Sequence, residues 1–505
     1  MIDRLLALPL IVLVMGIGAA SMMLPAVHAV VIDDHHVARA FFYFSILFLI
    51  LFVLIAIATS GYRIRRQGRS HLIALLATFT VLPLMLAVPF YEAVRNTTYL
   101  NAYVEMVSSL TTTGATLFEP ERLPPSVHLW RALVGWMGGF FVWVTAVAIL
   151  APLNLGGFEV RSTAAIGQGA SGATQISRVA DASERLTRFS MRLFPLYAVL
   201  TLVLWIALIA AGDTPLVAIC HAMSTLATSG ISPIDGTQGS TARLTGEIVI
   251  FVFLIFGLSR LTFAADERPE GLRSLGKDPE LRLGLALVAV VPIFFVLRHW
   301  VGAYDVSEEQ NVIAILQTLW GGAFTVLSYL TTTGFVSGSW QSAQAWSGLE
   351  TPGLILMGLA VFGGGVATTA GGVKLLRVYA LYKHGLREME KLVHPSSIGG
   401  AGQTARRLRR EGAYVAWIFF MLFAMSIALV MALLSLTGIN FEDALVLTIA
   451  SLTTTGPLTQ TAGAEPIVLA QLDESARLIF AAAMVLGRLE TLAIIALLNP
   501  DFWRA

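Results

Sequence analysis

Long runs of apolar residues separated by short polar stretches dominate the chain. A run of about 20 apolar residues is long enough to cross a bilayer as a helix. We interpret the first run as a retained spanning helix rather than a cleaved signal peptide, because it is long and only Arg4 precedes it. The pattern predicts ten spanning helices, at 5–30, 40–60, 72–91, 129–152, 190–211, 245–265, 281–300, 352–382, 412–437 and 476–498.

Four other apolar segments are too short or too polar to span, and each ends in a cluster of Thr or Ser followed by Gly. Non-helical backbone at membrane depth persists only where protein buries it or where it lines a water-filled cavity. We therefore predict four re-entrant helices, near 98–110, 214–227, 312–330 and 440–452.

The four polar clusters are copies of one another. Aligned on glycine, they read SSLTTTG, STLATSG, SYLTTTG and ASLTTTG, and they end at Gly114, Gly230, Gly334 and Gly456. The predicted unit is a spanning helix, a re-entrant helix, an extended Thr–Thr–Gly stretch and a second spanning helix, and it occurs four times. A unit that occurs four times can surround one axis, which is the geometry of a pore.

The chemistry of these stretches suits a cation that has lost its water. Such a cation needs replacement oxygens, which rings of backbone carbonyls supply in potassium channels. Thr adds a hydroxyl and its β-branch favours extended backbone, while Gly permits the left-handed conformation that turns carbonyls toward an axis. The partially negative C-terminal ends of the re-entrant helices favour a cation at the same place. A single TTTG is equally compatible with a helix cap, but four in phase favour a pore.

Composition agrees with an integral membrane protein. The chain has 505 residues, of which 56% are hydrophobic and 13% are charged, against about 25% charged residues in soluble proteins. A net charge of +1 gives no indication of a nucleic-acid partner. The single cysteine, Cys220, excludes an intrachain disulfide framework and a Cys-rich metal site.

Basic residues gather in alternate loops. Clusters of Lys and Arg lie in 61–70, 153–192, 260–282 and 374–412. Cytoplasmic loops of membrane proteins carry the excess of Lys and Arg. This pattern places both termini in the cytoplasm and opens the four re-entrant segments to the outer side.

Two features are candidates for a gate. GGGVATTAGG, at 363–372, interrupts the predicted helix 352–382 and is followed by Lys374 and Arg377; it is compatible with close helix packing through small residues, but we interpret it as a mobile loop below the pore. Arg488 lies near the middle of the last apolar helix, where a charge is costly and usually functional. A buried ion pair or a side chain reaching the interface is the alternative for Arg488.

These motifs together resemble the Trk/Ktr/HKT potassium-transporter superfamily, and most closely the membrane subunit of the TrkH/TrkG type. The resemblance rests on the four clusters and on ICHAMSTLATSG (219–230), FGGGVATTAGGVKLLRVYALYKHGLREMEKLVHP (362–395) and MVLGRLETLAIIALLNPDFWR (484–504). It implies an all-α integral membrane fold of four pseudo-symmetric helix–pore-helix–filter–helix repeats around one pore. The implied divisions are two N-terminal transmembrane helices in 1–70 and repeats in 71–160, 161–276, 277–400, which holds an intramembrane loop, and 401–505.

Carried over residue by residue, the resemblance implies an ion-selectivity filter and a gate. In plant relatives a serine in place of the first glycine accompanies sodium transport, so four intact glycines favour potassium. Arg488 would lie beneath the filter and repel potassium until the gate moves. The implied filter residues are Thr112, Thr113, Gly114, Thr228, Ser229, Gly230, Thr332, Thr333, Gly334, Thr454, Thr455 and Gly456. The implied gate residues are Gly363, Gly364, Gly365, Thr368, Thr369, Gly371, Gly372 and Arg488.

The chain departs from the family pattern in two places. Its fourth TTTG is intact where relatives of this type often lack one, and IFGLSRLTF (255–263) replaces a Gly-Gly-x-Asn-Phe pattern. Because of the second departure, the family's local packing and subunit contacts are not carried over to 255–263.

The resemblance also implies partners and a location. It implies uptake of K+ across the bacterial inner membrane, a homodimer, and a cytoplasmic NAD- or ATP-binding regulatory subunit docked on the basic face 374–412. The chain contains neither a P-loop nor a dinucleotide-binding glycine motif, so we expect any nucleotide to bind the partner and no organic cofactor on this chain.

Other functions stay open at this stage. A sodium-selective or cation-coupled secondary carrier, including a symporter, would share the same architecture. An intramembrane enzyme needs a nucleophile with a base, or a carboxylate pair, at membrane depth. Arg488, Glu490 and Glu247 do not supply such a set, so we do not expect an enzyme.

Overall fold

The computed structural model describes residues 8–59, 67–151, 182–259, 278–302, 311–349, 351–394, 410–463 and 465–489. These residues form helices and connecting turns and no strand, which confirms the all-α prediction. All four predicted cytoplasmic basic clusters, in 61–70, 153–192, 260–282 and 374–412, lie partly outside these ranges, and Glu490 lies outside them.

Eight helices among the described residues are long and apolar enough to cross a membrane. The spans are Leu10–Val31, His35–Thr59, Leu72–Ala93, Pro125–Leu150, Arg185–Ala210, Pro279–Arg298, Val312–Leu330 and Gly412–Ser435. Such a set of helices is the signature of a multi-pass membrane protein, since every backbone polar group in lipid needs an internal partner.

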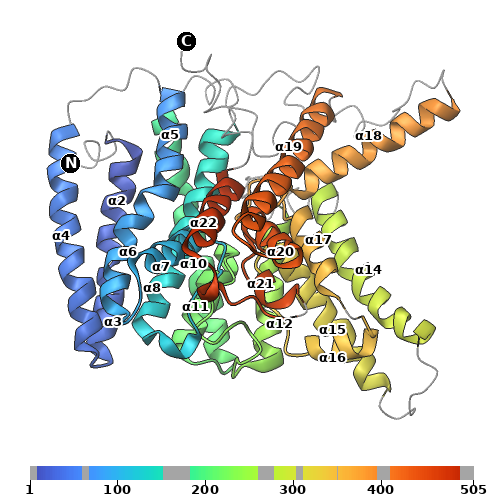
Figure 1. Cartoon of the computed structure of the whole chain (residues 1–505), viewed down its shortest axis with the longest axis horizontal. Coiled ribbons are helices and arrows are strands. Elements are labelled where there is room, and N and C mark those ends of the chain that lie inside the picture. The colour runs from blue at the N-terminus through green and yellow to red at the C-terminus, as the bar shows by residue number, and fades with distance from the viewer. Residues whose placement is uncertain are drawn as a thin grey trace.

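Three N-terminal helices, α2 (Leu10–Ser21), α3 (Met23–Val31) and α4 (His35–Thr59), stand at one edge of the molecule (Figure 1). The Ser45 hydroxyl of α4 donates to the carbonyl of Ala19 in α2 at 2.8 Å, which joins the helices through a buried hydrogen bond. Most of the other face of α4 exposes apolar side chains, as expected for a helix in contact with lipid.

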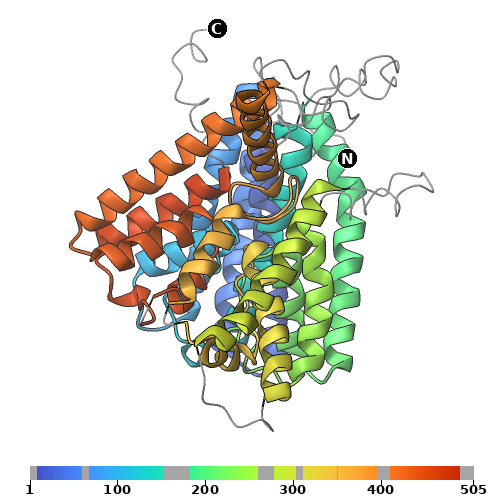
Figure 2. The same ribbon diagram turned by 90° about the vertical axis from the view of Figure 1, so that its right-hand side faces the viewer.

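The remaining helices build the body, with α14 to α16 at the opposite edge from the N-terminal helices and α18 extending away from it (Figures 1 and 2). Their bounds are α5 (Gln67–Thr80), α6 (Leu82–Ala93), α7 (Tyr99–Leu110), α8 (Pro125–Thr145), α10 (Ala182–Ala210), α11 (Pro215–Ala227), α12 (Arg243–Leu254), α14 (Pro279–Gly302), α15 (Asn311–Leu330), α16 (Trp340–Ser347), α17 (Gly353–Phe362), α18 (Leu375–Val393), α19 (Arg410–Ser435), α20 (Phe441–Leu452), α21 (Leu458–Thr461) and α22 (Glu474–Leu489).

The short helices α7, α11 and α20 begin at residues suited to helix N-termini. The Thr98 hydroxyl accepts from the N–H of Asn101 at 3.3 Å, and Asn440 Oδ1 accepts from the N–H of Asp443 at 2.8 Å. Pro215 occupies the first position of α11, where its missing N–H costs nothing. Each of these helices ends where a Thr/Ser–Gly cluster begins.

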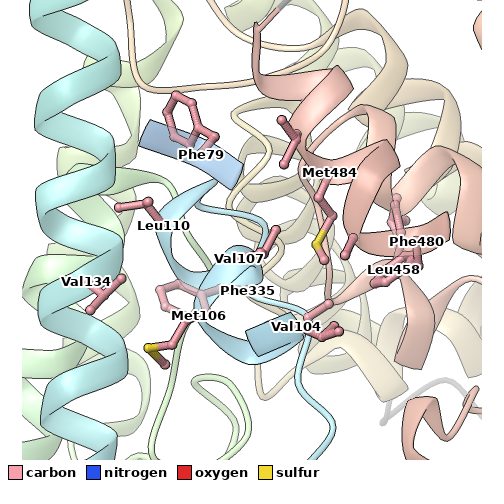
Figure 3. Close-up of a cluster of buried hydrophobic side chains, with 14 of the residues drawn as sticks. Phe79, Val104, Met106, Val107, Leu110, Val134, Phe335, Leu458, Phe480 and Met484 are labelled. Atoms are coloured by element: carbon pink, nitrogen blue, oxygen red, sulfur yellow. The ribbon is translucent and has the colours of Figure 1, made fainter. Parts of the chain in front are cut away.

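The buried core surrounds α7. Figure 3 shows Met106 and Val107 of α7 among Val134 of α8 and Met484 of α22. All four side chains are fully buried, each with an exposed fraction of 0%. From Val104 to Leu110 every residue of α7 is buried, so this end of the helix lies inside the protein rather than against lipid.

Two predicted elements differ in extent from the structure, those at 352–382 and 245–265. The segment 312–330 matches helix α15 to within one residue and ends at a Thr–Gly cluster as predicted; its length and composition also make it a candidate span. The helix predicted at 352–382 is two helices, because the backbone of 363–374 bonds to other parts of the chain. The helix predicted at 245–265 ends at Leu254 and continues as the 3₁₀ turn Ile255–Leu258. The described part of 476–498 ends at Leu489.

Candidate cation site

The four threonine–glycine segments, 111–114, 227–230, 331–334 and 453–456, share one backbone conformation. The residue two before each glycine is left-handed, with φ of 55° at Thr112, 50° at Thr228, 57° at Thr332 and 54° at Thr454. The residue between this threonine and the glycine has no positive φ, whereas the glycines at 114, 230 and 334 do, at 73°, 66° and 84°. The sign of φ therefore alternates along the first three segments, and only Gly456 departs from the pattern.

Each of the preceding helices ends in the same hydrogen bond. The N–H of the residue after the left-handed threonine donates to the carbonyl five residues earlier, as from Thr113 to Ser108 at 2.9 Å and from Thr455 to Ala450 at 2.8 Å. This is the Schellman end of a helix, in which glycine is the usual left-handed residue. A β-branched residue there is strained, and strain of this kind is concentrated at functional sites.

The extended backbone that the sequence predicted is therefore wrong at the four left-handed threonines. In an extended chain successive groups point to opposite sides. A left-handed residue between residues of negative φ breaks this regular alternation. The sequence left two interpretations of each TTTG-like cluster, a helix cap or an oxygen-bearing stretch of a pore. In the structure each cluster caps a helix and also belongs to the oxygen-bearing stretch.

The four segments close a ring. The glycine of each segment lies against the next segment so tightly that a β-carbon would come within 1.9 to 2.7 Å of it; the contacts are Gly114 with Ser229, Gly230 with Thr333, Gly334 with Pro457 and Gly456 with Ala115. The N–H of Gly456 also donates to the carbonyl of Thr113 at 2.6 Å, which joins the fourth segment to the first. Glycine is needed at each contact because a side chain has no room there.

A cavity of about 640 Å³ opens on this ring. All four glycines line it, together with residues that follow the segments, such as Ser232, Asp235 and Thr459. Gln460 Nε2 donates to Asp235 Oδ1 at 3.0 Å across the lining. The lining of this cavity is more polar than apolar.

The Gly-rich loop, residues 363–374, contacts the ring on three segments. Thr369 Oγ1 donates to the carbonyl of Leu226 at 3.1 Å and lies 3.1 Å from the Thr228 hydroxyl. The N–H of Gly371 donates to Thr332 Oγ1 at 2.7 Å. A β-carbon at Gly371 would come within 2.2 Å of the carbonyl of Thr453 in the fourth segment. The loop therefore packs directly against the ring.

Bonds on its other side hold the loop in place. The N–H of Gly365 donates to the carbonyl of Gly257 at 3.0 Å, and the N–H of Val366 donates to Glu280 Oε1 at 2.9 Å. The N–H of Val373 donates to the carbonyl of Val361 at 2.9 Å. The loop is thus a buried part of the structure, and its small residues pack closely against their neighbours.

Arg488 meets the same loop. Its Nη2 donates to the carbonyl of Thr369 at 2.7 Å, and the side chain is buried near the end of the described part of α22. The alternative in which Arg488 reaches toward the membrane interface is wrong, because the guanidinium is directed at the loop. The two candidate gate features, which are far apart in sequence, are in contact.

The four left-handed threonines differ in their hydroxyl partners. The hydroxyls of Thr228 and Thr332 contact the Gly-rich loop. Those of Thr112 and Thr454 are buried and form no hydrogen bond within the described part of the chain. Two hydroxyls of the ring therefore have unused hydrogen-bonding capacity.

A buried ion pair beside the first segment was missed in the sequence. Glu105 Oε1 lies 2.6 Å from Arg131 Nε, and the side chains are 0% and 4% exposed. Glu247, considered in the sequence only as a member of an enzyme site, accepts from the Ser337 hydroxyl at 2.8 Å and from the N–H of Gly338 at 2.6 Å. The signal for the pair was a carboxylate inside a short apolar helix, which is costly unless it is paired.

Spanning helices, a ring built from four segments rich in oxygens, and a cavity that opens on it define a membrane transport protein. A family model described as "TrkH: Cation transport protein" matches residues 75–502. The chain belongs to the TrkH family of cation transport proteins.

Individual relatives agree with this assignment. The chain is 30% identical over 446 residues to the Trk system potassium uptake protein TrkH of Salmonella typhimurium, covering 87% of this chain and 86% of that protein. It is 26% identical over 499 residues to the Trk system potassium uptake protein TrkG of Escherichia coli, covering 96% of each. Its fold matches the crystal structure of the potassium transporter TrkH from Vibrio parahaemolyticus with a TM-score of 0.79, at 24% identity and over 100% of both chains.

Proposed function

We propose that this protein takes up potassium across the bacterial inner membrane through the ring of four threonine–glycine segments. The observation that carries the proposal is the cyclic contact of the segments, each glycine against the next. The choice of potassium as the ion is supported by the relatives, which are named as potassium uptake proteins. The filter residues are those of the four segments, at 112–114, 228–230, 332–334 and 454–456, drawn from four repeats of one chain.

Potassium fits this ring for physical reasons. A dehydrated K+ needs several oxygens at once, and the backbone carbonyls of the four segments supply them from four directions. The helices α7, α11, α15 and α20 end at the ring, so their partially negative C-termini lower the energy of a cation there. Four intact glycines let the segments approach closely enough to share one ion.

The Gly-rich loop and Arg488 act as the gate in this proposal. The loop packs against three of the four segments, and Arg488 holds its Thr369 carbonyl. A positive charge this near the ring raises the energy of a cation that leaves it, and the effect is strong where water is excluded. Transport requires that the loop and Arg488 move away together.

Regulation from the cytoplasm acts through α18 in this proposal. The helix extends from the body directly after the Gly-rich loop, and it exposes Tyr382, Lys383, Arg387 and Met389 (Figure 1). A nucleotide-binding subunit docked on α18 can therefore displace the Gly-rich loop, because the loop and α18 are consecutive in the chain. We also propose that both termini are cytoplasmic and that the protein assembles as a homodimer, as the family resemblance implies.

Flux measurements test the proposal. Purified protein in liposomes is expected to take up Rb+, a potassium surrogate, faster than Na+, and the gene is expected to restore growth of a potassium-uptake-deficient strain in low-potassium medium. A preference for Na+ would favour a sodium-selective carrier, and dependence of uptake on a proton or sodium gradient would favour a coupled carrier. Absence of any cation uptake by folded protein would contradict the proposal.

A further inference from the structure

We propose that the buried pair Glu105–Arg131 fixes the first segment of the ring and is a determinant of ion selectivity. The inference rests on the proposed potassium uptake. Glu105 uses both carboxylate oxygens: Oε1 pairs with Arg131 at 2.6 Å, and Oε2 accepts from the N–H of Leu117 at 3.0 Å. Leu117 lies three residues after Gly114, so the carboxylate holds the chain as it leaves the ring.

The position of Glu105 has a counterpart in every repeat. The residue nine positions before each segment glycine is Glu105, His221, Thr325 or Leu447. Thr325 Oγ1 accepts from the N–H of Ser337 at 3.3 Å, and His221 Nε2 lies 2.9 Å from the Ser232 hydroxyl. Three repeats thus hold the chain after the glycine with a polar side chain at this position, and the carboxylate at this position occurs only in the first; in the third repeat a carboxylate from α12, Glu247, adds bonds to Ser337 and Gly338.

The fourth repeat holds the chain after its glycine through backbone hydrogen bonds instead of a side chain. Leu447 has no polar atom, and the chain after Gly456 enters the short helix α21 instead. There the N–H of Thr459 donates to the carbonyl of Gly456 at 3.0 Å. In every repeat, hydrogen bonds therefore hold the chain that follows the glycine. In the first repeat, the carboxylate of the Glu105–Arg131 ion pair makes this bond.

Neighbouring contacts leave the pair little freedom to move. A β-carbon at Gly138 of α8 would come within 2.0 Å of the carbonyl of Leu110, so α8 presses directly on the end of α7. On the other side, Gly456 of the fourth segment packs against Ala115. The stretch between Gly114 and Leu117 is held between the fourth segment and Glu105, so a change at Glu105 moves the first segment of the ring.

The pair also controls charge at the cavity. Arg131 lines the cavity that opens on the ring, and Glu105 neutralises it. Without Glu105, an unpaired positive charge would face the ions that enter. A loss of the carboxylate therefore has two consequences that can be separated: the ring loosens, which changes selectivity, and the charge at the mouth slows uptake.

The experiment compares Rb+ and Na+ uptake by purified protein in liposomes for the wild type, Glu105→Gln, Glu105→Asp, and the double variant Glu105→Gln with Arg131→Met. Glu105→Gln is expected to lower the Rb+/Na+ ratio by about tenfold, which corresponds to about 1.4 kcal/mol of discrimination, and to slow Rb+ uptake. The double variant is expected to recover the rate but not the ratio. Glu105→Asp keeps the charge but shortens the side chain, so it is expected to lower the ratio and keep the rate.

Glu92→Gln, at an exposed carboxylate at the end of α6, is the matched control and is expected to match the wild type. An unchanged Rb+/Na+ ratio in both Glu105→Asp and the double variant, with a wild type that transports Rb+, would overturn the inference. A wild type that transports neither ion would contradict the proposed function instead. Should Glu105→Gln fail to fold, Glu105→Asp and the double variant still decide the outcome.

Discussion

Arg488 donates a hydrogen bond of 2.7 Å from Nη2 to the carbonyl oxygen of Thr369. The hydroxyl of the same Thr369 donates to the carbonyl of Leu226, immediately before the second segment of the ring. A short path of hydrogen bonds thus connects α22, the Gly-rich loop and the ring. Any change that releases Arg488 from Thr369 is expected to loosen the loop beneath the ring.

Replacement of Arg488 by Gln is expected to raise basal Rb+ flux. The shorter neutral side chain loses both the bond to Thr369 and the charge near the ring. A barrier lowered by about 1.4 kcal/mol raises the flux about tenfold. Arg95→Gln, which removes the same charge at an exposed position just after α6, is the control and is expected to leave the flux unchanged. Unchanged or reduced flux in folded Arg488→Gln protein would argue against an electrostatic barrier.

Substitution of Gly371 by Ala is expected to displace the Gly-rich loop. The new methyl group would come within 2.2 Å of the carbonyl of Thr453 and 2.4 Å of Thr454 Oγ1. Crowding of this kind costs about 1–3 kcal/mol, so the expected results are a lower melting temperature and a higher basal flux. Gly358→Ala in α17 is the control, because no atom lies within 4 Å of its β-carbon position. A closed, fully stable Gly371→Ala protein would show that the loop is not wedged against the ring.

Removal of the Thr332 hydroxyl is expected to weaken the contact between loop and ring. In Thr332→Val the buried N–H of Gly371 loses its acceptor at 2.7 Å, at a cost of about 1–3 kcal/mol. Basal Rb+ flux is expected to rise in the Val variant and to stay near the wild-type value in Thr332→Ser, which keeps the hydroxyl. Equal flux in the two variants would mean that this hydrogen bond does not hold the loop.

Replacement of Gly334 by Ser is expected to reduce discrimination between K+ and Na+. Gly334 has φ of 84°, and a β-carbon there would lie 2.7 Å from the ring of Pro457. The left-handed conformation alone costs a non-glycine residue about 1–2 kcal/mol, and the clash moves the third segment away from the fourth. The ratio of Rb+ to Na+ uptake in liposomes measures the effect, and a ratio equal to that of the wild type would exclude Gly334 from the selective site.

The sequence predicted those features that depend on local pattern. Apolar runs identified the spanning helices, and the recurrence of Leu, Thr and Gly in register identified the four segments and the ends of their helices. The interruption of 352–382 was also predicted, since the glycines of GGGVATTAGG do not sustain a helix. These signals lie within a few residues of one another, so no tertiary contact is needed to find them.

Other features depend on contacts between distant parts of the chain, and sequence reasoning did not find them. Thr112 adopts a left-handed conformation against its own preference, because the helix end and the neighbouring segments impose it. The pairing of Glu105 with Arg131 and the bond from Arg488 to Thr369 join residues whose proximity no local pattern encodes. The bounds of α15 were predicted to within one residue, but the segment was classed as too short or too polar to span, whereas its length and composition make it a candidate span.

The central claim is that the four segments together form one cation site. Crystals of the protein soaked in Tl+ or Rb+ test it directly, because the anomalous scattering of these ions locates potassium positions. The account predicts a peak on the axis of the ring, in contact with carbonyl oxygens from all four segments. Peaks confined to other places, with the ring empty in protein that transports Rb+, would contradict it.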